Sequence, residues 1–362
     1  MNKIIYLDAA ATYQKPESVI QSQVDFLRNH YANAGRGICA RAAYVDDIVM
    51  RARRRVADFM MATEQQIVFT SGTTGAINMI AHMLNIKSDM VVGVSDLDHH
   101  SARLPFEKSV AKTVVVPLDS EFNIDINNVP CVDVLVLTAM SNVLGNVQKI
   151  PEIVRMARDK NPNVIVIVDA AQYVVHEKIN VGAWDADFVV WSAHKIGADT
   201  GLGVMYVKNP DDFQPVIFGG GMVNRVIGDD LILANGPEKF EAGTLPLTQI
   251  AGLVTAIDEI EQNRPNLDLI KYMYDELQNV PRIKILSARD ATVLTFVVDG
   301  MHVLDFGTMA GANNICLRVG NMCATWIHNL LGVPGSIRMS VGAYNTIDDV
   351  SYAVRVIKDI IK

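Results

Sequence analysis

The sequence has 362 residues, half of them hydrophobic, so the chain is long enough for one large domain and a smaller one with substantial cores. Charged residues make up 20% of the chain and the formal net charge is −8, which argues against broad electrostatic binding of nucleic acid or anionic lipid. No apolar stretch approaches the roughly 20 residues of a membrane span, and the first residues lack a signal-peptide pattern. We therefore expect a cytoplasmic protein whose partners include neither nucleic acid nor a membrane.

A basic run lies before the first strand that we expect in the larger domain. It reads Arg51-Ala-Arg53-Arg54-Arg55 and falls within a helical pattern in which apolar residues are interleaved. We interpret the run as a solvated helix face rather than a polyanion site.

Short apolar runs rich in β-branched residues alternate with helical patterns from about residue 60 to residue 210. Residues 164–168 are apolar at every position, which is typical of a strand buried on both faces of a parallel sheet. Helices are expected at Thr74–Leu84 and Ile150–Asp159. The alternation predicts an α/β fold with a mainly parallel, helix-covered central sheet. The expected strands are Gln66–Thr70, Met90–Val94, Thr113–Pro117, Val132–Thr138, Val164–Asp169, Phe188–Ser192 and Gly203–Val207.

The remainder of the chain predicts a smaller α+β unit. A long helical pattern at Thr248–Glu261 precedes a further helix, two strands at Arg282–Leu286 and Thr292–Val298, and helices near Val303 and from Ile347. The first 16 residues are too few for a domain, so we expect them to pack on this unit. The predicted domains are residues 17–262 (large) and residues 1–16 plus 263–362 (small).

Loops at the carboxyl ends of parallel strands commonly hold ligands, and several distinctive residues fall there. Residues 69–75, Phe-Thr-Ser-Gly-Thr-Thr-Gly, follow a strand and open a helix, so they offer backbone N–H groups and hydroxyls to an anion. A plain strand–turn–helix with Ser and Thr caps is the alternative. Asp98-His99-His100 follows another strand, and the histidines indicate a ring-stacking or proton-transferring role, a metal ligand pair, or an ordinary loop. No second cluster supports a metal, so we predict none.

Two ionisable residues follow buried strands. Asp169 ends the most apolar strand, where a carboxylate needs a cationic partner such as a pyridinium N–H, unless it is simply a helix N-cap. Lys195 follows the next strand within Ser192-Ala-His194-Lys195, where desolvation lowers an amine's pKa toward nucleophilicity. The glycines behind it, Gly201-Leu-Gly203, lack the rest of a dinucleotide-binding fingerprint.

The C-terminal part adds an arginine pair and a cysteine. Arg318 precedes Cys323 in a loop that contains Gly and Asn, and Arg338 lies in a short apolar strand. A buried arginine suits a carboxylate because its planar fork donates two hydrogen bonds. The four cysteines show no CxxC spacing, so neither a disulfide framework nor a zinc knuckle is indicated.

Taken in order, these motifs resemble the SUF-type cysteine desulfurase and selenocysteine lyase group of class V aminotransferase-fold enzymes. The resemblance runs along nearly the whole chain and implies pyridoxal-5′-phosphate (PLP) as cofactor on a fold-type-I scaffold. The matching stretches are Tyr6-Leu-Asp8-Ala-Ala-Ala11, Arg36-Gly37-Ile38, Gly72-Thr73-Thr74, Asp98-His99-His100, Ser141-Asn142-Val-Leu-Gly145, Val168-Asp169-Ala-Ala-Gln172, Ser192-Ala-His194-Lys195, Gly219-Gly-Gly221-Met222, Phe240-Glu-Ala-Gly243-Thr244, the loop from Arg318 to Cys323, and Arg338-Met-Ser.

The resemblance also implies a role for each matching residue. Lys195 is the Schiff-base lysine, and Cys323 is the thiol that takes sulfur from cofactor-bound L-cysteine as a persulfide while L-alanine leaves. The implied cofactor contacts are Asp169 (ring nitrogen), Gln172 (ring oxygen), His99 (ring face), Thr73, Ser192 and His194 (phosphate), Thr74, and Thr244 from the other subunit of a homodimer. Asn142 and Arg338 are implied to bind the substrate carboxylate, with Arg318 beside them.

Five positions depart from the pattern of that group, and they leave the sulfur acceptor and the substrate open. Cys39 and the pair Asn321-Met322 replace histidines, while Asp98 and Ala170 replace a glutamate and a glycine. Cys39 is either a second thiol near the site or a small packed residue. The expected activity is transfer of cysteine sulfur to an acceptor protein, for iron–sulfur assembly or another thiolation pathway. The alternatives are an L-selenocysteine lyase, another lyase, epimerase or aminotransferase, or a scaffold protein without activity.

Overall fold

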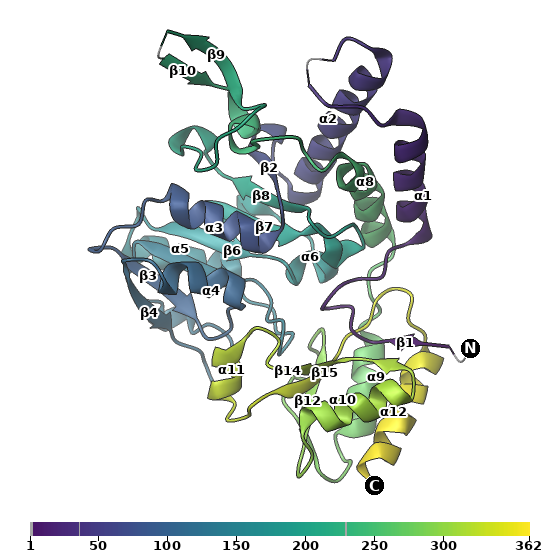
Figure 1. The fold of residues 1–362 in the computed structure, drawn as a ribbon. Helices are drawn as coiled ribbons and strands as arrows, with labels where there is room; N and C mark the ends of the chain where they lie inside the picture. The colour runs from purple at the N-terminus through teal and green to yellow at the C-terminus, as the bar shows by residue number, and fades with distance from the viewer. Residues whose placement is uncertain (1–2, 36, 229) are drawn as a thin grey trace.

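A seven-stranded sheet forms the centre of the larger part of the molecule (Figure 1). The computed structural model describes residues 3–35, 37–228 and 230–362, so Arg36 of the matched motifs lies outside the described residues. The strand order is β2-β8-β7-β6-β5-β3-β4, and β8 runs antiparallel to both neighbours while the other pairs are parallel. The strands are β2 (Ile67–Thr70), β3 (Val91–Ser95), β4 (Lys112–Val116), β5 (Val134–Thr138), β6 (Ile165–Asp169), β7 (Phe188–Ser192) and β8 (Gly203–Val207). The predicted α/β class and all seven predicted strands are confirmed, with bounds that differ by at most two residues.

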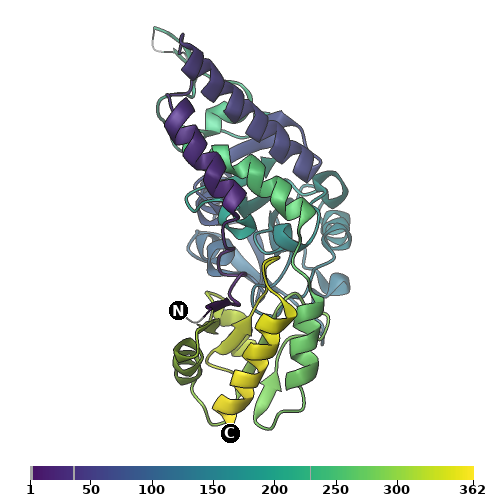
Figure 2. The same cartoon turned by 90° about the vertical axis from the view of Figure 1, so that its right-hand side faces the viewer.

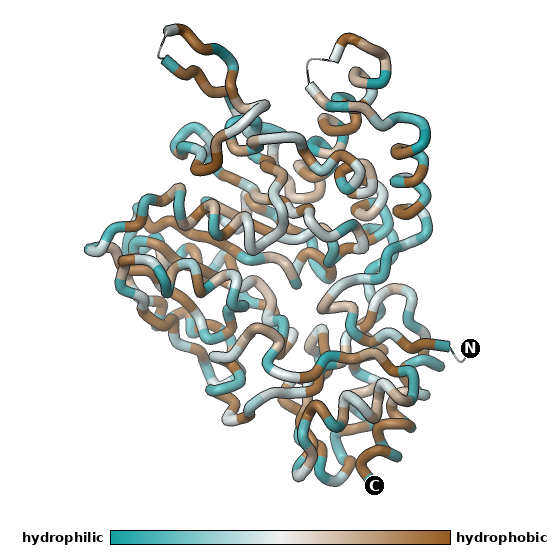
Figure 3. Tube along the Cα trace, in the orientation of Figure 1, coloured by the Kyte–Doolittle hydropathy of each residue, from teal (hydrophilic) through white to brown (hydrophobic). Residues whose placement is uncertain are grey.

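Helices cover both faces of this sheet because successive residues of its buried strands point to opposite sides. Ile167 packs in one cluster with Ile77 and Phe106 of the helices on the first face, whereas Val166 and Val168 belong to the cluster on the second face. In Figure 3 the central strands are hydrophobic along much of their length. The first face carries α3 (Thr73–Met83) and α4 (His100–Glu107), and the second carries α2 (Ala40–Met60), α5 (Ile150–Lys160), α6 (Tyr173–His176), α7 (Val181–Trp184) and α8 (Leu247–Gln262), with α1 (Glu17–Asp25) packed on α8.

A smaller antiparallel sheet of order β11-β12-β15-β14 forms a second layered unit, which lies below the larger one in Figure 2. Strand β1 (Ile5–Tyr6) pairs with β13 (Ile315–Cys316), and Ile5 and Leu7 belong to this unit's hydrophobic cluster. The N-terminal residues therefore pack where we expected, while the domain boundaries stay a prediction. The other elements of the unit are α9 (Asp268–Leu277), β11 (Ile283–Ile285), β12 (Leu294–Val298), α10 (Val303–Ala312), β14 (Arg318–Gly320), α11 (Thr325–Leu330), β15 (Ser336–Met339) and α12 (Ile347–Ile361).

A β-hairpin that follows the strands of the central sheet has no counterpart among the sequence predictions. A hairpin of β9 (Val223–Ile227) and β10 (Asp230–Leu233) projects from the larger unit in Figures 1 and 2. Apolar side chains on both of its strands are exposed, among them Val226 and Leu231. In the part of the chain that the structure describes, no helix has the length and apolarity that a membrane span requires.

The prediction that the basic run on α2 is a solvated face is wrong for one of its members. Arg53 is buried, and its guanidinium forms a two-point ion pair with the buried carboxylate of Glu241 at 2.8 and 2.7 Å. The same carboxylate accepts a hydrogen bond from the backbone N–H of Phe69 in β2. Burial raises the pKa of Glu241 and the ion pair opposes that effect, so the pair ties α2 to the central sheet.

We expect Arg53→Met to lower the free energy of unfolding by about 3–5 kcal/mol, because it leaves the Glu241 carboxylate buried without its cation. Denaturant titration of the purified protein measures this loss. Arg54→Met on the same helix is the matched control: Arg54 is exposed and pairs with Glu64 at the surface, so its loss should change stability little. Equal effects of the two substitutions would contradict the structural role of the buried pair.

Candidate active site

A cavity of about 230 Å³ lies at the carboxyl ends of β5, β6 and β7, where ligands bind in sheets of this kind. Most of the site residues predicted from the sequence meet there, although they come from distant parts of the chain. Those that line the cavity are Thr73, Thr74, His99, Asn142, Asp169, Gln172, Ser192, His194 and Lys195.

Lys195 lies in the 3₁₀ turn η4 (Ala193–Ile196) that directly follows β7. Its amine donates hydrogen bonds to the backbone carbonyls of Ala10 and Ala11 at 2.7 and 3.0 Å. Burial and the positive charge of Arg338 lower the pKa of this amine to about 8. A substantial fraction is therefore neutral near physiological pH, as a nucleophilic amine requires.

Asp169 ends β6 on the floor of the cavity and is buried. Its Oδ1 accepts a hydrogen bond from the backbone N–H of Ala171 at 2.9 Å, and no ion pair to it is formed among the described residues. Burial raises the pKa of the carboxyl group to about 6, with that hydrogen bond and Lys195 acting in the opposite direction. A protonated ring nitrogen placed beside Asp169 would supply the cation that the buried carboxylate lacks.

The first turn of α3 and the end of β7 form a polar corner suited to an anion. The Thr73 N–H and hydroxyl lie 2.9 and 2.8 Å from the Ser192 hydroxyl oxygen, and His194 lines the same cavity. The backbones approach closely here, because a Cβ on Gly203 would lie 2.5 Å from the Cα of Gly72. Two hydroxyls beside a helix N-terminus fit the phosphate group predicted for this corner.

His99 is the N-cap of α4, and its ring is held in one tautomer. The backbone N–H of Ser101 donates to Nδ1 at 3.2 Å, which leaves the proton of the neutral ring on Nε2. Burial, together with the charges of Lys195, His100 and Arg338, lowers the pKa of His99 to about 4. The ring is therefore neutral at pH 7, a state suited to lying against an aromatic cofactor or passing on a proton.

A pair of arginines lies beside Asn142 at the small-unit side of the cavity. Arg338 of β15 is buried and donates from one terminal nitrogen to the Asn142 carbonyl at 2.7 Å, and Arg318 is its cross-strand partner on β14. Within the described residues, Arg338 Nε and Asn142 Oδ1 are buried without a hydrogen-bond partner. Neither arginine lines the cavity itself, but Arg338 Nε is an unused donor of the kind that a substrate carboxylate accepts from.

Cys323 lies outside this cavity, in an adjoining groove of about 450 Å³. The groove and the cavity share Thr74, His99 and Ser101 as a common wall. The thiol residue is exposed, and its backbone has a left-handed φ of 54°, which is rare for a residue with a side chain. Its carbonyl accepts a hydrogen bond from the His100 N–H at 2.7 Å, so this unusual conformation is fixed next to the histidine pair.

Thr244 and Cys39 do not join these residues within one chain. Thr244 lines a separate cavity of about 520 Å³ with Gly220 and Gly221, and Cys39 is exposed at the start of α2. The exposure of Cys39 contradicts the interpretation as a small packed residue. Within the described ranges, no group of three His, Cys, Asp or Glu residues is arranged to hold a metal ion.

Comparison with known proteins identifies the family of this site. The family model described as Aminotransferase class-V matches residues 5–352. The chain belongs to the class V aminotransferase family. Members of this family use PLP, and the part-buried Lys195 amine, the Asp169 carboxylate without an ion pair and the polar corner at Thr73 fit the parts of that cofactor.

Curated relatives in the class V family extend over almost the whole chain. A protein named "Probable cysteine desulfurase" from Vibrio cholerae is 33% identical over 98% of this chain and 93% of its own length. A cysteine desulfurase from Serratia proteamaculans is 32% identical over 97% of this chain and 92% of its own length.

Solved structures of class V relatives superpose closely on this fold. The apo cysteine desulfurase from Thermococcus onnurineus NA1 has a TM-score of 0.93 at 28% identity and covers 99% of this chain and 95% of its own. The cysteine desulfurase CsdA from Escherichia coli, in an S-sulfonic acid form, has a TM-score of 0.90 at 30% identity, over 98% and 94% of the two chains. The resemblance to the cysteine desulfurase group expected from the motifs is thereby confirmed.

Sequence reasoning missed the contribution of the N-terminal segment to this class V site. Ala10 and Ala11 supply carbonyls to Lys195, and the Ala10 carbonyl also accepts from the Gln172 side chain at 2.9 Å. Asp8, which belongs to the matched motif at residues 6–11, contacts both arginines. Apart from that motif, the sequence signal for Asp8 was a carboxylate between apolar neighbours in a strand-like pattern.

We expect covalent attachment of the cofactor to speed up as the pH rises and to level off above about pH 8, the pKa of Lys195. The neutral amine is the reactive form, and its fraction falls about tenfold for each pH unit below the pKa. Mixing the cofactor-free protein with PLP at several pH values and recording the visible absorbance measures the rate. Arg338→Met should move the midpoint of this pH dependence to higher pH, since the Arg338 charge lowers the pKa of Lys195. A midpoint of the wild-type protein near the ordinary lysine pKa of 10.5 would contradict the expectation.

Proposed function

We propose that this protein is a PLP-dependent cysteine desulfurase, which converts L-cysteine to L-alanine and holds the sulfur as a persulfide on Cys323 for transfer to an acceptor protein. The observation that carries the proposal is the position of the exposed Cys323 in a groove that shares its wall with the Lys195 cavity. The cysteine desulfurases of similar sequence and structure support the same reaction.

In the proposed reaction Lys195, Asp169 and His99 act on the cofactor and on the proton at the substrate Cα. Bound PLP supplies an electron sink that stabilises negative charge at the substrate Cα. Lys195 would hold the cofactor, and its amine would move the proton at the substrate Cα, because that amine has a pKa of about 8. Asp169 holds the proton on the ring nitrogen, and His99 presents a neutral ring to the cofactor face.

The sulfur step belongs to Cys323. Its thiolate forms a bond to the substrate sulfur while the Cβ–Sγ bond breaks, and the alanine skeleton keeps that electron pair and takes up a proton. Arg338 and Asn142 hold the substrate carboxylate so that the substrate sulfur faces the groove. The product is a persulfide on an exposed residue, which an acceptor can reach.

We further propose that the protein acts in the cytoplasm as a homodimer and supplies sulfur for iron–sulfur cluster assembly or another thiolation pathway. Two observations support a second subunit. Thr244, expected at the phosphate, lines a separate cavity in its own chain, and the β9–β10 hairpin exposes apolar side chains such as Val226 and Leu231.

The proposed activity predicts that the protein forms alanine and sulfide in equal amounts from L-cysteine under a reductant. The cofactor absorbance should shift on addition of L-cysteine, because the substrate amine would compete with Lys195 for the cofactor. L-Serine, which carries a hydroxyl in place of the thiol, is the control and should release no alanine. A cofactor band that does not respond to L-cysteine would refute the substrate and leave the family assignment standing.

A further inference from the structure

A buried carboxylate at the edge of the site has no role in the reaction described so far. Asp8 is 6% exposed, yet its two oxygens contact two different arginines. Oδ2 lies 2.7 Å from a terminal nitrogen of Arg318, and Oδ1 lies 3.1 Å from a terminal nitrogen of Arg338. A carboxylate placed between two guanidinium groups orients both of them.

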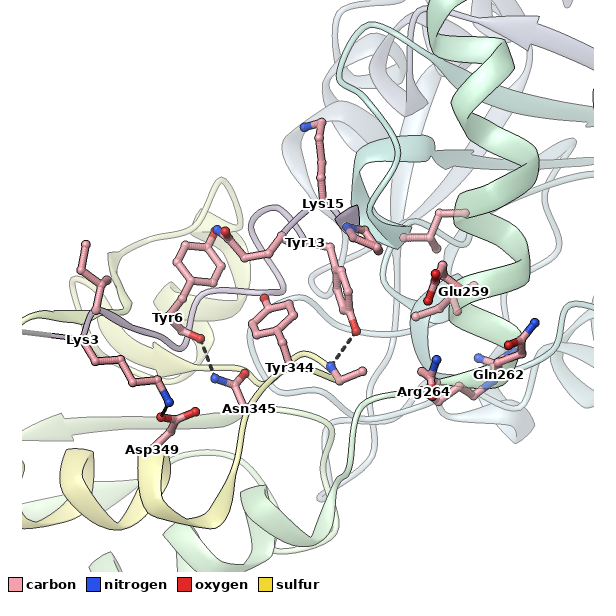
Figure 4. Close-up of a pocket in the computed structure, with 17 residues that line it drawn as sticks. Lys3, Tyr6, Tyr13, Lys15, Glu259, Gln262, Arg264, Tyr344, Asn345 and Asp349 are labelled. Atoms are coloured by element: carbon pink, nitrogen blue, oxygen red, sulfur yellow. Dashed lines mark hydrogen bonds and ion pairs between the residues drawn. The ribbon is translucent and has the colours of Figure 1, made fainter. Parts of the chain in front are cut away.

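The segment that carries Asp8 is held firmly in place. The Tyr6 hydroxyl donates to the Thr12 carbonyl at 2.9 Å and so closes the segment on itself, and the Ala10 N–H donates to the Ser340 hydroxyl at 2.9 Å. The Asn345 side chain donates to the Tyr6 carbonyl, and the Ala343 N–H donates to the Tyr13 hydroxyl (Figure 4). Four of these residues, Tyr6, Tyr13, Ala343 and Asn345, line a cavity of about 710 Å³ that contains none of the site residues, so we assign them a structural role.

Within the part of the chain that the structure describes, the hydrogen bonds of Arg338 use both terminal nitrogens of its guanidinium and leave the Nε–H free to bind another group. One terminal nitrogen is used by the Asn142 carbonyl and the other contacts Asp8, while Nε has no partner among the described residues. Arg338 is buried, so water does not readily satisfy this Nε–H. The orientation of the guanidinium, and therefore the direction of Nε–H, depends on the two contacts that are already made.

The positive and negative charges of the Asp8, Arg318 and Arg338 side chains do not cancel. Arg318 and Arg338 bring two positive charges and Asp8 brings one negative charge, so one positive charge is left over. All three groups act on the Lys195 amine, Arg338 and Arg318 lowering its pKa and Asp8 raising it, which places them near the reacting centre. The excess positive charge favours an anionic ligand, and Asp8 sets the direction in which the arginines present it.

We propose that Asp8 is a positioning residue for the substrate carboxylate: it fixes the direction of the Arg338 fork. The inference rests on the proposed function, because it takes an amino acid as the substrate. Its effect is confined to ligands that carry a carboxylate. A residue needed only for folding would affect all amine ligands alike.

The test compares two ligands of the PLP-loaded protein. L-Alanine is the expected product, and ethylamine is the same molecule without its carboxylate. Titration of the cofactor absorbance measures the half-saturation concentration of each. In Asp8→Asn we expect the value for L-alanine to rise about tenfold, as for the loss of a hydrogen bond to a charged group, and the value for ethylamine to change less than about twofold.

Asp349→Asn is the matched control. Asp349 is equally buried and pairs with Lys3 at the start of α12, away from the cavity, so neither ligand should respond. An unchanged L-alanine value in Asp8→Asn, or equal shifts for both ligands, would overturn the proposal. If Asp8→Asn does not fold, Asp8→Glu retains the charge but displaces the carboxylate, and the same criterion applies to it.

The outcome separates this inference from the proposed function. If wild-type protein binds L-alanine but forms no sulfide from L-cysteine, the desulfurase assignment fails while the comparison of L-alanine with ethylamine still decides the role of Asp8. If wild-type protein releases sulfide and Asp8→Asn retains its affinity for L-alanine, only the role of Asp8 is refuted.

Discussion

Lys195→Met should abolish sulfide release from L-cysteine and remove the visible absorbance of covalently held cofactor. The methionine side chain has nearly the same length and fills the same part-buried position, but it has no amine to form the bond or to move the proton at Cα. Purified variant and wild type are compared by absorbance and by the amounts of alanine and sulfide formed. This change has the largest effect that we expect of any single substitution.

Lys239→Met is the control for the loss of a buried lysine. Lys239 is buried in the turn η6 (Gly236–Phe240), and its amine lies 4.0 Å from Asp211 rather than in the cavity. Its loss should leave the cofactor absorbance in place. Retention of the absorbance and of turnover by Lys195→Met would remove Lys195 from the mechanism.

The second large effect is expected from Cys323→Ser, which should reduce sulfide release at least about 100-fold because the positioned thiolate is lost. The cofactor absorbance should still shift with L-cysteine, since the cavity around Lys195 does not include Cys323. If Cys323→Ser still binds L-cysteine but no longer releases sulfide, the defect lies in the sulfur step and not in cofactor binding. Stopped-flow absorbance and a sulfide assay on the same preparation measure both.

Two other exposed cysteines serve as controls for this variant. Cys39→Ser and Cys131→Ser remove thiols that share the exposure of Cys323 but lie outside its groove. Both variants should retain turnover. Undiminished turnover in Cys323→Ser would leave the protein at most a direct lyase, and a loss in Cys39→Ser instead would move the nucleophile to that residue.

The strands of the central sheet could be predicted because burial on both faces leaves a continuous apolar run. Residues 164–168 carried that pattern, and β6 lies in the middle of the sheet. The direction of a strand has no such signature. The antiparallel orientation of β8 depends on its pairing with β2 and β7, which no local pattern records.

Among the site residues, Lys195 and Asp169 could be predicted because each follows a buried strand and therefore lies at the ligand-binding edge of the sheet. The ion pair of Asp8 with Arg338 joins residues 330 positions apart, and only the folded chain brings them together. The prediction that Arg53 lies on a solvated helix face was wrong for the same reason. Its partner Glu241 lies 188 positions away, so an arginine on a basic helix gave no sign of being buried.

The contacts of the N-terminal segment have a consequence for the order of assembly during synthesis on the ribosome. Ile5 and Tyr6 pair with residues 315–316, and Asp8 forms a bridge with Ser340, while Ala10 and Ala11 contact Lys195. Residues 5–8 thus gain these partners only after residues 315–340 have been made. All seven strands of the central sheet are complete by residue 207, so the sheet is able to form first. The carbonyls opposite Lys195 and the carboxylate between the arginines then reach their places only once residues 315–340 have joined the fold.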